Sequence, residues 1–307
     1  MPNIKKPIFN QQNLNTGYDA KHPLKSFFVK AFRISLASLK GFERHECSLR
    51  ASALSFYTML SIVPALAVVF GLAKGFGIDK YLEQQLMSQF YEQREFVNKI
   101  LEFSYSLLKS TQGGLIAGIG VIVLLWTILQ VLSSIEGSFN AIWHVPYPRS
   151  FARKLSDYLA MILLCPFFFV ASSSLFLSVM TYFSEETDAF GLYIKASFHL
   201  FPFLMCWILF SFLYIFMPNT KVFFSNGIIA GICAGTVYQI VQLIYIKFQI
   251  GASNYGAIYG SFAAVPLFLA WMYASWVVTL AGAEIAYNLQ NDRRIISAKG
   301  EQSVSKQ

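Results

Sequence analysis

The sequence predicts an all-α membrane protein, a polytopic helical bundle with six transmembrane helices. Of its 307 residues, 55% are hydrophobic and 13% are charged, whereas a soluble domain carries about 25% charged residues. The hydrophobic residues also fall in long blocks, which is typical of helices that cross a bilayer. We expect one membrane domain over residues 21–290, with a disordered N-terminus at 1–20 and a disordered tail at 291–307.

Six apolar segments have the length of about 20 residues that a membrane-spanning helix needs. They run over about 51–73, 115–134, 158–183, 198–216, 227–248 and 256–283. An even number of spans places both termini on one side of the membrane. On that assignment, 17 of the 24 Lys and Arg residues lie on the side of the termini and seven lie on the other. Because basic residues accumulate on the cytoplasmic side, we expect both termini to be cytoplasmic.

Two further helical segments flank the first span. Residues 24–42 alternate phenylalanine and leucine with lysine and arginine at helical spacing. This pattern predicts a basic amphipathic N-terminal helix, which either lies in the inner membrane interface or packs against the bundle. Residues 78–111 contain no Gly or Pro and have balanced charges. They predict one or two amphipathic helices on the outer face, which form a lid or dock a partner.

The sequence contains no pattern typical of an enzyme. None of the four cysteines lies in a C-x-x-C, and we interpret them as buried small side chains. The four histidines are scattered, and no spacing typical of a zinc hydrolase, a P-loop or a serine hydrolase occurs. We therefore expect no catalytic residues, no metal, no cofactor and no nucleic-acid partner.

Charged residues at the ends of three spans are candidates for a functional site, because burying charge in a bilayer is costly. Arg50 begins the first span, Glu136 follows the second, and Glu284 follows the sixth. Under the predicted topology they share one depth near the cytoplasmic face. There they neutralise one another, bind a charged lipid headgroup, or extend to water as ordinary interfacial side chains.

Uncharged polar residues extend this candidate set. Gln130 lies in the second span, and Gln239 and Gln242 lie in the fifth, where they hydrogen-bond to neighbouring helices or line a polar path. Asn254 and Tyr255 stand just before the sixth span. These residues complete the predicted substrate, headgroup or polar-path set.

Small or helix-breaking residues are candidates for close helix packing or for a gate. They are Pro64, Gly227, Gly231, Gly235, Gly256, Gly260 and Pro266. A proline within a span frees a backbone carbonyl and usually kinks the helix. The glycines at 227, 231 and 235 form a doubled G-x-x-x-G, a pattern that lets another helix approach closely.

Three stretches together resemble the YihY/BrkB family of bacterial inner-membrane proteins. They are RASALSFYTMLSIVPALAVV, IEGSFNAIWHV and NYGAIYGSFAAVPLFLAWMYASWVVTLAGAEIAYN. The six-span layout agrees with that family over about residues 30–290. The resemblance implies a multi-pass inner-membrane protein linked to the handling of envelope lipids, and it supplies no established catalytic set. The family was once labelled ribonuclease BN, but nothing in this sequence is typical of a nuclease site.

Our leading hypothesis is a transporter or lipid-handling protein that translocates envelope lipids. In this hypothesis Arg50 contacts the headgroup and membrane lipids are the partners. The alternative is a non-transporting membrane scaffold that binds an envelope protein through the outer helices at 78–111. An enzyme acting on RNA is a third and disfavoured hypothesis. The sequence leaves the oligomeric state, including a homo-oligomer, open.

Overall fold

The computed structural model describes most of the predicted bundle. The described residues are 23–75, 77, 79–89, 97–99, 101–102, 105–106, 114–158, 200–254 and 264–304. All regular secondary structure in these ranges is helical, as the sequence predicts. Side chains are described over somewhat shorter stretches of the same ranges.

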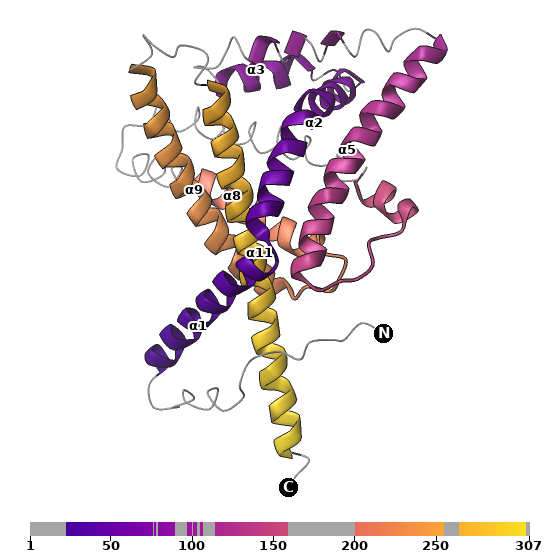
Figure 1. Ribbon diagram of the computed structural model, residues 1–307. Coiled ribbons are helices and arrows are strands. Elements are labelled where there is room, and N and C mark those ends of the chain that lie inside the picture. The colour runs from indigo at the N-terminus through magenta and orange to yellow at the C-terminus, as the bar shows by residue number, and fades with distance from the viewer. Residues whose placement is uncertain are drawn as a thin grey trace, which may run out of the picture.

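Seven helices position the candidate residues. They are α1 (Pro23–Arg44), α2 (Cys47–Gly75), α3 (Asp79–Gln89), α5 (Gly114–Ile142), α8 (Phe201–Phe216), α9 (Phe224–Asn254) and α11 (Ala264–Val304). Figure 1 shows α3 lying across one end of the bundle, while α1 leaves the opposite end at an angle. We call these two ends of the bundle the α3 end and the α1 end.

Three described helices are long and apolar enough to cross a membrane. Their apolar segments are Cys47–Gly71, Phe224–Phe248 and Pro266–Asp292. The first two agree closely with the predicted first and fifth spans, and the third overlaps the predicted sixth span, 256–283, from 266 onward. The shorter apolar helix α8 coincides with the predicted fourth span, and α5 covers the second. The predicted third span, 158–183, lies outside the described residues after its first position. The number of six spans therefore stays a prediction.

In the last third of the chain, the C-terminal end of α11 differs from the expectation. The described part of α11 begins at Ala264, and residues 255–263, with Tyr255, Gly256 and Gly260, lie outside the described residues, so the span start at 256 stays a prediction. At its other end α11 continues to Val304, so most of the tail expected to be disordered is helical. A helix that is already nucleated extends at little cost through a segment without proline, which accounts for this difference.

The N-terminal amphipathic helix packs on the bundle with one face. Asp292 of α11 pairs with Arg33 and, at 3.3 Å, with the Nζ of Lys30. On another face of α1, Phe32 and Leu39 are each 68% exposed. Packing along α11 is therefore observed, and contact of the exposed apolar face with the membrane interface stays a prediction.

Parts of the predicted outer segment, 78–111, pack against α2 at the α3 end of the bundle. Phe70 and Ala73 of α2 form a buried cluster with Leu82 of α3 and Leu101. In the same segment Tyr105 donates a hydrogen bond to Glu83 at 3.2 Å, and burial, helped by Glu83, raises the pKa of this tyrosine to about 12. These contacts favour the lid among the two alternatives left open for residues 78–111.

The doubled G-x-x-x-G does form a close helix contact. Helix α9 turns Gly227, Gly231 and Gly235 toward α8. A Cβ on Gly231 would stand only 2.6 Å from the backbone nitrogen of Ser211, and one on Gly235 would meet the Trp207 side chain at 2.8 Å. Only glycine leaves room for α8 at this distance, so the prediction of close packing is confirmed for these positions.

The two candidate prolines differ in position. Pro64 lies inside α2, in the middle of its apolar segment, as predicted for a kink site. Pro266 is the third residue of α11. A proline is tolerated there because the first turn of a helix has no intrahelical acceptor for its amide groups. Pro266 therefore lies at the start of the described part of this helix.

Candidate functional site

Two fully buried carboxylates lie near the α1 end of the bundle. Glu136 near the end of α5 and Glu284 of α11 are both 0% exposed. Their neighbours along the chain, Phe139 and Ala283, belong to one buried cluster that also contains Cys47 at the start of α2. The interpretation of these glutamates as interfacial side chains extending to water is therefore wrong. Each faces the interior of the bundle because the apolar face of its helix does.

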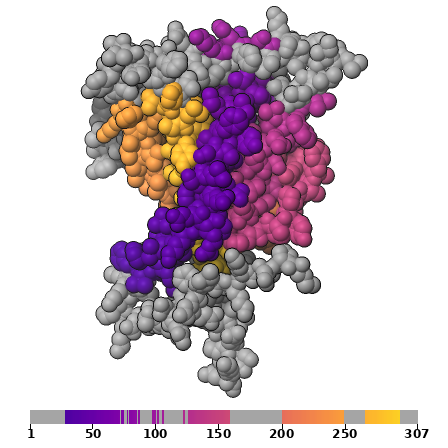
Figure 2. All heavy atoms as spheres, in the orientation of Figure 1, coloured from indigo at the N-terminus to yellow at the C-terminus, as the bar shows by residue number. Residues whose placement is uncertain are grey.

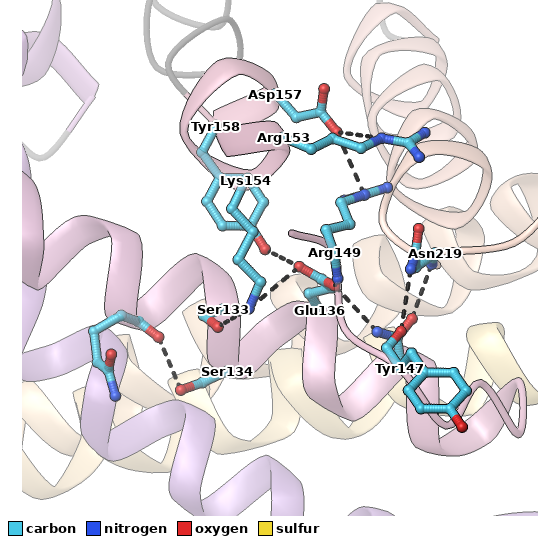
Figure 3. Close-up of polar contacts among 12 residues, drawn as sticks. Ser133, Ser134, Glu136, Tyr147, Arg149, Arg153, Lys154, Asp157, Tyr158 and Asn219 are labelled. Carbon is cyan, nitrogen blue, oxygen red and sulfur yellow. Dashed lines mark hydrogen bonds and ion pairs between the residues drawn. The ribbon is translucent and has the colours of Figure 1, made fainter. Parts of the chain in front are cut away.

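Both carboxylate oxygens of Glu136 accept hydrogen bonds (Figure 3). Oε1 accepts from the backbone N–H of Arg149 at 2.9 Å and from Asn140 at 3.2 Å. Oε2 accepts from the hydroxyl of Tyr158, and the Nζ of Lys154 lies 3.8 Å from it. The charge is thus opposed by an ammonium group and both oxygens have donors, which is the condition under which a buried carboxylate is tolerated.

The Glu136 cluster also joins α5 to the chain that follows α8. Arg149 donates from Nη2 to the carbonyl of Phe216 at 2.5 Å, and its Nε lies 3.4 Å from Asp157. Asn140 accepts a hydrogen bond at 2.8 Å from the backbone N–H of Asn219. These contacts cross between distant segments and saturate the carboxylate, so we interpret the cluster as a structural closure of the α1 end.

Glu284 has a different environment. Its Oε1 lies 2.5 Å from Nδ1 of His45, and the Cys47 thiol donates weakly to the same oxygen at 3.8 Å. Its Oε2 is buried and has no hydrogen-bond partner among the described residues. On that side the carboxylate packs on Gly41 of α1, where a Cβ would collide with it. The site is therefore assembled from α1, the α1–α2 turn and α11.

Two histidines connect this carboxylate to the surface. The ring centroids of His45 and His144 lie 4.9 Å apart in an edge-to-face arrangement, and the ring of His144 contacts Tyr287 of α11 at 5.3 Å. Glu46 and His144 have left-handed backbones, with φ of 52° and 54°, which end the preceding helices and direct the chain back. Partial burial lowers the pKa of His144, and the neighbouring His45 acts in the same direction.

Arg50 does not pair with either glutamate in the described structure. Its Nε donates to the carbonyl of His45 at 2.9 Å, so it closes the α1–α2 turn. Its two terminal nitrogens contact no partner within the described part of the chain. The expected mutual neutralisation of Arg50, Glu136 and Glu284 is therefore not observed, because each glutamate has a nearer basic or histidine partner.

The uncharged candidates do not form one polar path in the described residues. Gln239 is buried and donates to the Cys206 sulfur at 3.1 Å, a bond between α9 and α8. Gln130 is exposed on α5 and Gln242 is half-buried on α9. Asn254 ends α9, and its side chain is not described. For Gln239, bonding between helices is the alternative that the structure supports.

Sequence reasoning missed the partners of both glutamates. His45 and Arg149 lie between helices, and Lys154 and Tyr158 lie in the short helical stretch 151–158, of which only Tyr158 belongs to a predicted span. The signal available was the position of His45 directly between two helices. In the described part of the chain, no three His, Cys, Asp or Glu side chains are placed to hold a metal ion.

Comparisons with known proteins give a consistent result. The profile of the family described as virulence factor BrkB matches residues 38–306. The UPF0761 membrane protein RSc1559 of Ralstonia nicotianae is 33% identical over 250 residues, which cover 78% of this chain and 54% of that protein. The UPF0761 membrane protein lpg0643 of Legionella pneumophila is 28% identical over 272 residues, covering 87% and 64%. The chain thus spans 54% of the length of the first relative and 64% of the second. No solved structure matches.

Proposed function

Because this chain belongs to the family of membrane proteins described as virulence factor BrkB, we propose that it is a transporter that moves envelope lipids. It resides in the bacterial inner membrane, crosses it several times and keeps both termini in the cytoplasm. The observation that carries the proposal is Arg50, whose terminal nitrogens are unengaged by described residues beside an exposed apolar surface. The proposal contains no catalytic step and no nucleic-acid partner.

Arg50 has the chemistry and the position to bind a lipid phosphate. The planar guanidinium presents paired N–H donors that match two phosphate oxygens. Only its Nε is used, by the His45 carbonyl, which fixes the side chain and leaves the outer edge of the fork available. The residue lies in the first turn of α2, at the α1 end of its apolar segment, where headgroups meet a spanning helix.

The surface beside Arg50 is suited to acyl chains. Large apolar side chains of α1 and α2 are exposed, among them Leu49 next to Arg50 in the chain, and Leu39, Phe56 and Leu60. The two helices form one continuous surface on this face of the molecule (Figure 2). Such a surface is unfavourable in water and favourable against lipid. A headgroup on Arg50 with its tails along α2 satisfies both parts of a phospholipid.

The test measures lipid movement in proteoliposomes that contain a fluorescent phospholipid and a reductant in the outer solution. The wild-type protein should accelerate movement between leaflets, and Arg50→Ala should reduce the rate about tenfold or more, since a charge-assisted hydrogen bond contributes about 1.5–3 kcal/mol. Arg50→Lys should restore part of the rate, because it keeps the charge and loses the fork.

Arg153→Ala is the matched control. Arg153 lies in the segment after α5, is 66% exposed and, among the described residues, pairs with Asp157 at 3.7 Å. Its removal should leave the rate within about twofold, in line with the small contribution of exposed ion pairs. A wild-type rate equal to that of empty liposomes contradicts transport. A normal rate in Arg50→Ala contradicts the role of Arg50 as the headgroup site and leaves the transport function standing.

A scaffold remains the competing function, and the outer segment distinguishes it. The buried contacts between α3 and α2 hold this segment against the bundle, and the side chains of Lys80 and Gln84 are exposed. A photo-crosslinker at Gln84 should trap one envelope protein reproducibly if the chain is a scaffold. In the transporter that we propose, it traps none and lipid movement is retained in the labelled protein.

A further inference from the structure

Three titratable side chains lead from the centre of the bundle to its surface. Glu284 is fully buried, the His45 side chain is 11% exposed, and His144 is exposed. The first contact is short, at 2.5 Å between Oε1 and Nδ1. The second is a ring contact with centroids 4.9 Å apart. Exposure therefore increases from Glu284 to His45 to His144, in the order in which the three side chains contact one another.

The inner pair keeps unused hydrogen-bonding capacity. Nε2 of His45 and Oε2 of Glu284 are both buried and without a hydrogen-bond partner among the described residues. Glu136, the other fully buried carboxylate, has donors on both oxygens and an ammonium group 3.8 Å away. Glu136 therefore has no vacant position for a proton, whereas the Glu284–His45 pair has two.

We propose that His144, His45 and Glu284 form a proton-uptake path that couples proton binding to the movement of substrate, an inference that rests on the proposed transport function. In the uptake step, Nε2 of His45 accepts one proton that arrives from solvent by way of His144. The Nδ1 proton of His45 then passes to Oε1 of Glu284. The carboxylate becomes a carboxylic acid, and His45 returns to neutrality in its other tautomer. One proton enters and the charge of the path rises by one unit.

The surrounding groups fit a carboxylate that waits for a proton. Two arginines supply positive charge near the path. Arg44 of α1 acts electrostatically on His144, and Arg50 of α2 acts on Cys47. Cys47 on α2, Tyr287 on α11 and the buried Tyr214 of α8, which donates to the Thr279 carbonyl, are neutral groups. The carboxylates nearest to His45 along the chain are Glu43 and Glu46, and both side chains are exposed.

Protonation of Glu284 is coupled to the position of α1 because α1 packs directly on the carboxylate. Gly41 of α1 rests directly on the carboxylate, with no space for even a Cβ between them. Loss of the negative charge weakens the attraction to His45, which lies in the two-residue turn between α1 and α2. Uptake of a proton therefore loosens α1 and the α1–α2 turn, where Arg50 holds the headgroup in the proposed function.

The test follows the protonated carboxyl group by time-resolved infrared difference spectroscopy after a pH jump from about pH 8 to about pH 5, which brackets the ordinary histidine pKa. The wild-type protein should show the carbonyl band of a buried carboxylic acid. Glu284→Gln should lack this band, and the matched variant Glu136→Gln should keep it. His144→Asn should retain the full band with formation slowed about tenfold or more, since a proton-transfer group contributes roughly 10²–10⁴-fold in rate.

The kinetic result separates a proton path from a structural role. A purely structural His144 would leave the rate of band formation unchanged, and this outcome contradicts the proposal. Absence of the band in the wild type, or its survival in Glu284→Gln, also contradicts it. Should Glu284→Gln fail to fold, His45→Gln takes its place and should abolish rapid formation of the band.

A parallel measurement of lipid movement with and without a pH gradient distinguishes the two proposals. Movement that is independent of pH and normal in Glu284→Gln contradicts the proton path and leaves the transport function standing. A titrating Glu284 without any lipid movement contradicts the transport function and leaves the proton site standing. Movement accelerated by the gradient and lost in Glu284→Gln supports both.

Discussion

At the scale of single residues, two glutamates with the same burial have different roles because of their neighbours. Glu136 is saturated by a backbone amide, an asparagine, a tyrosine and a lysine. Glu284 has a histidine and a weak thiol donor, and one oxygen is unsatisfied by described residues. A saturated buried carboxylate contributes to stability, whereas Glu284 is the carboxylate on which the proposed proton path ends.

Glu136→Ala should lower stability strongly. The substitution removes the acceptor of three donors and leaves the Lys154 ammonium, whose side chain is 19% exposed, without its partner. Breaking such a buried pair costs about 3–5 kcal/mol. Thermal unfolding of the purified protein in detergent measures the loss. Arg153→Ala is the surface control and should change stability by less than about 0.5 kcal/mol. Equal melting temperatures for Glu136→Ala and the wild type would refute the structural role.

His144 gives the protein a component of pH-dependent stability. Its pKa in the folded protein lies below the ordinary value of 6.5, so the unfolded chain takes up the proton first as the pH falls. Stability is therefore fully present above about pH 6.5 and declines as the pH drops toward the folded pKa. Melting temperatures between about pH 7 and pH 5 should fall less steeply for His144→Asn than for the wild type. A steeper fall in the variant would reverse the sign and rule out the argument.

At the scale of helices, the contact between α8 and α9 is set by the absence of side chains. Gly231 faces backbone atoms of Ser211, which cannot rotate away as a flexible side chain would. The glycine therefore fixes how closely the two helices approach. This is a property of the pair of helices, since the same residue type at Gly137 of α5 meets nothing within 4 Å.

Gly231→Ala should push α8 away from α9 and destabilise the protein by about 1–3 kcal/mol, the usual cost of overpacking. Gly137→Ala is the matched control. It should be neutral or stabilising by up to about 1 kcal/mol, because alanine favours the helix and the added methyl group meets no neighbour. Melting temperatures of both variants provide the comparison. A loss of similar size at both positions would contradict the packing argument, because helix propensity alone favours alanine at each of them.

The helices could be predicted from sequence, and their side-chain partners could not. Apolar blocks and the G-x-x-x-G pattern identify α2, α8, α9 and α11. The spacing of apolar residues along a helix indicates which of its faces is buried. This spacing does not indicate which other helix packs against that face. Glu284 meets His45 across 239 positions of sequence, and Arg149 meets the end of α8 across 67. Such pairs depend on loop geometry, so the glutamates were identified as candidates while their partners were missed.

At the scale of the whole molecule, the placement of charge bears on its orientation in the membrane. The basic helix α1 lies at the α1 end (Figure 1), and Arg149, Arg153 and Lys154 belong to the segment after α5 that contacts Glu136 near that end. Helix α3, in a segment of balanced charge, lies across the opposite end. The excess of basic residues on the cytoplasmic side predicts that the α1 end is cytoplasmic.

Single cysteines introduced at Lys80 of α3 and at Arg153 test this orientation, since both side chains are exposed and they belong to opposite ends. The native cysteines are first replaced by alanine or serine, which removes the exposed thiol of Cys233 from the background. In intact cells a membrane-impermeant maleimide should label the cysteine at 80 and should label the one at 153 only after permeabilisation. The reverse pattern would invert the molecule and place Arg50 and the Glu284–His45 pair at the outer leaflet. Protons would then enter from outside, and the headgroup bound by Arg50 would belong to that leaflet.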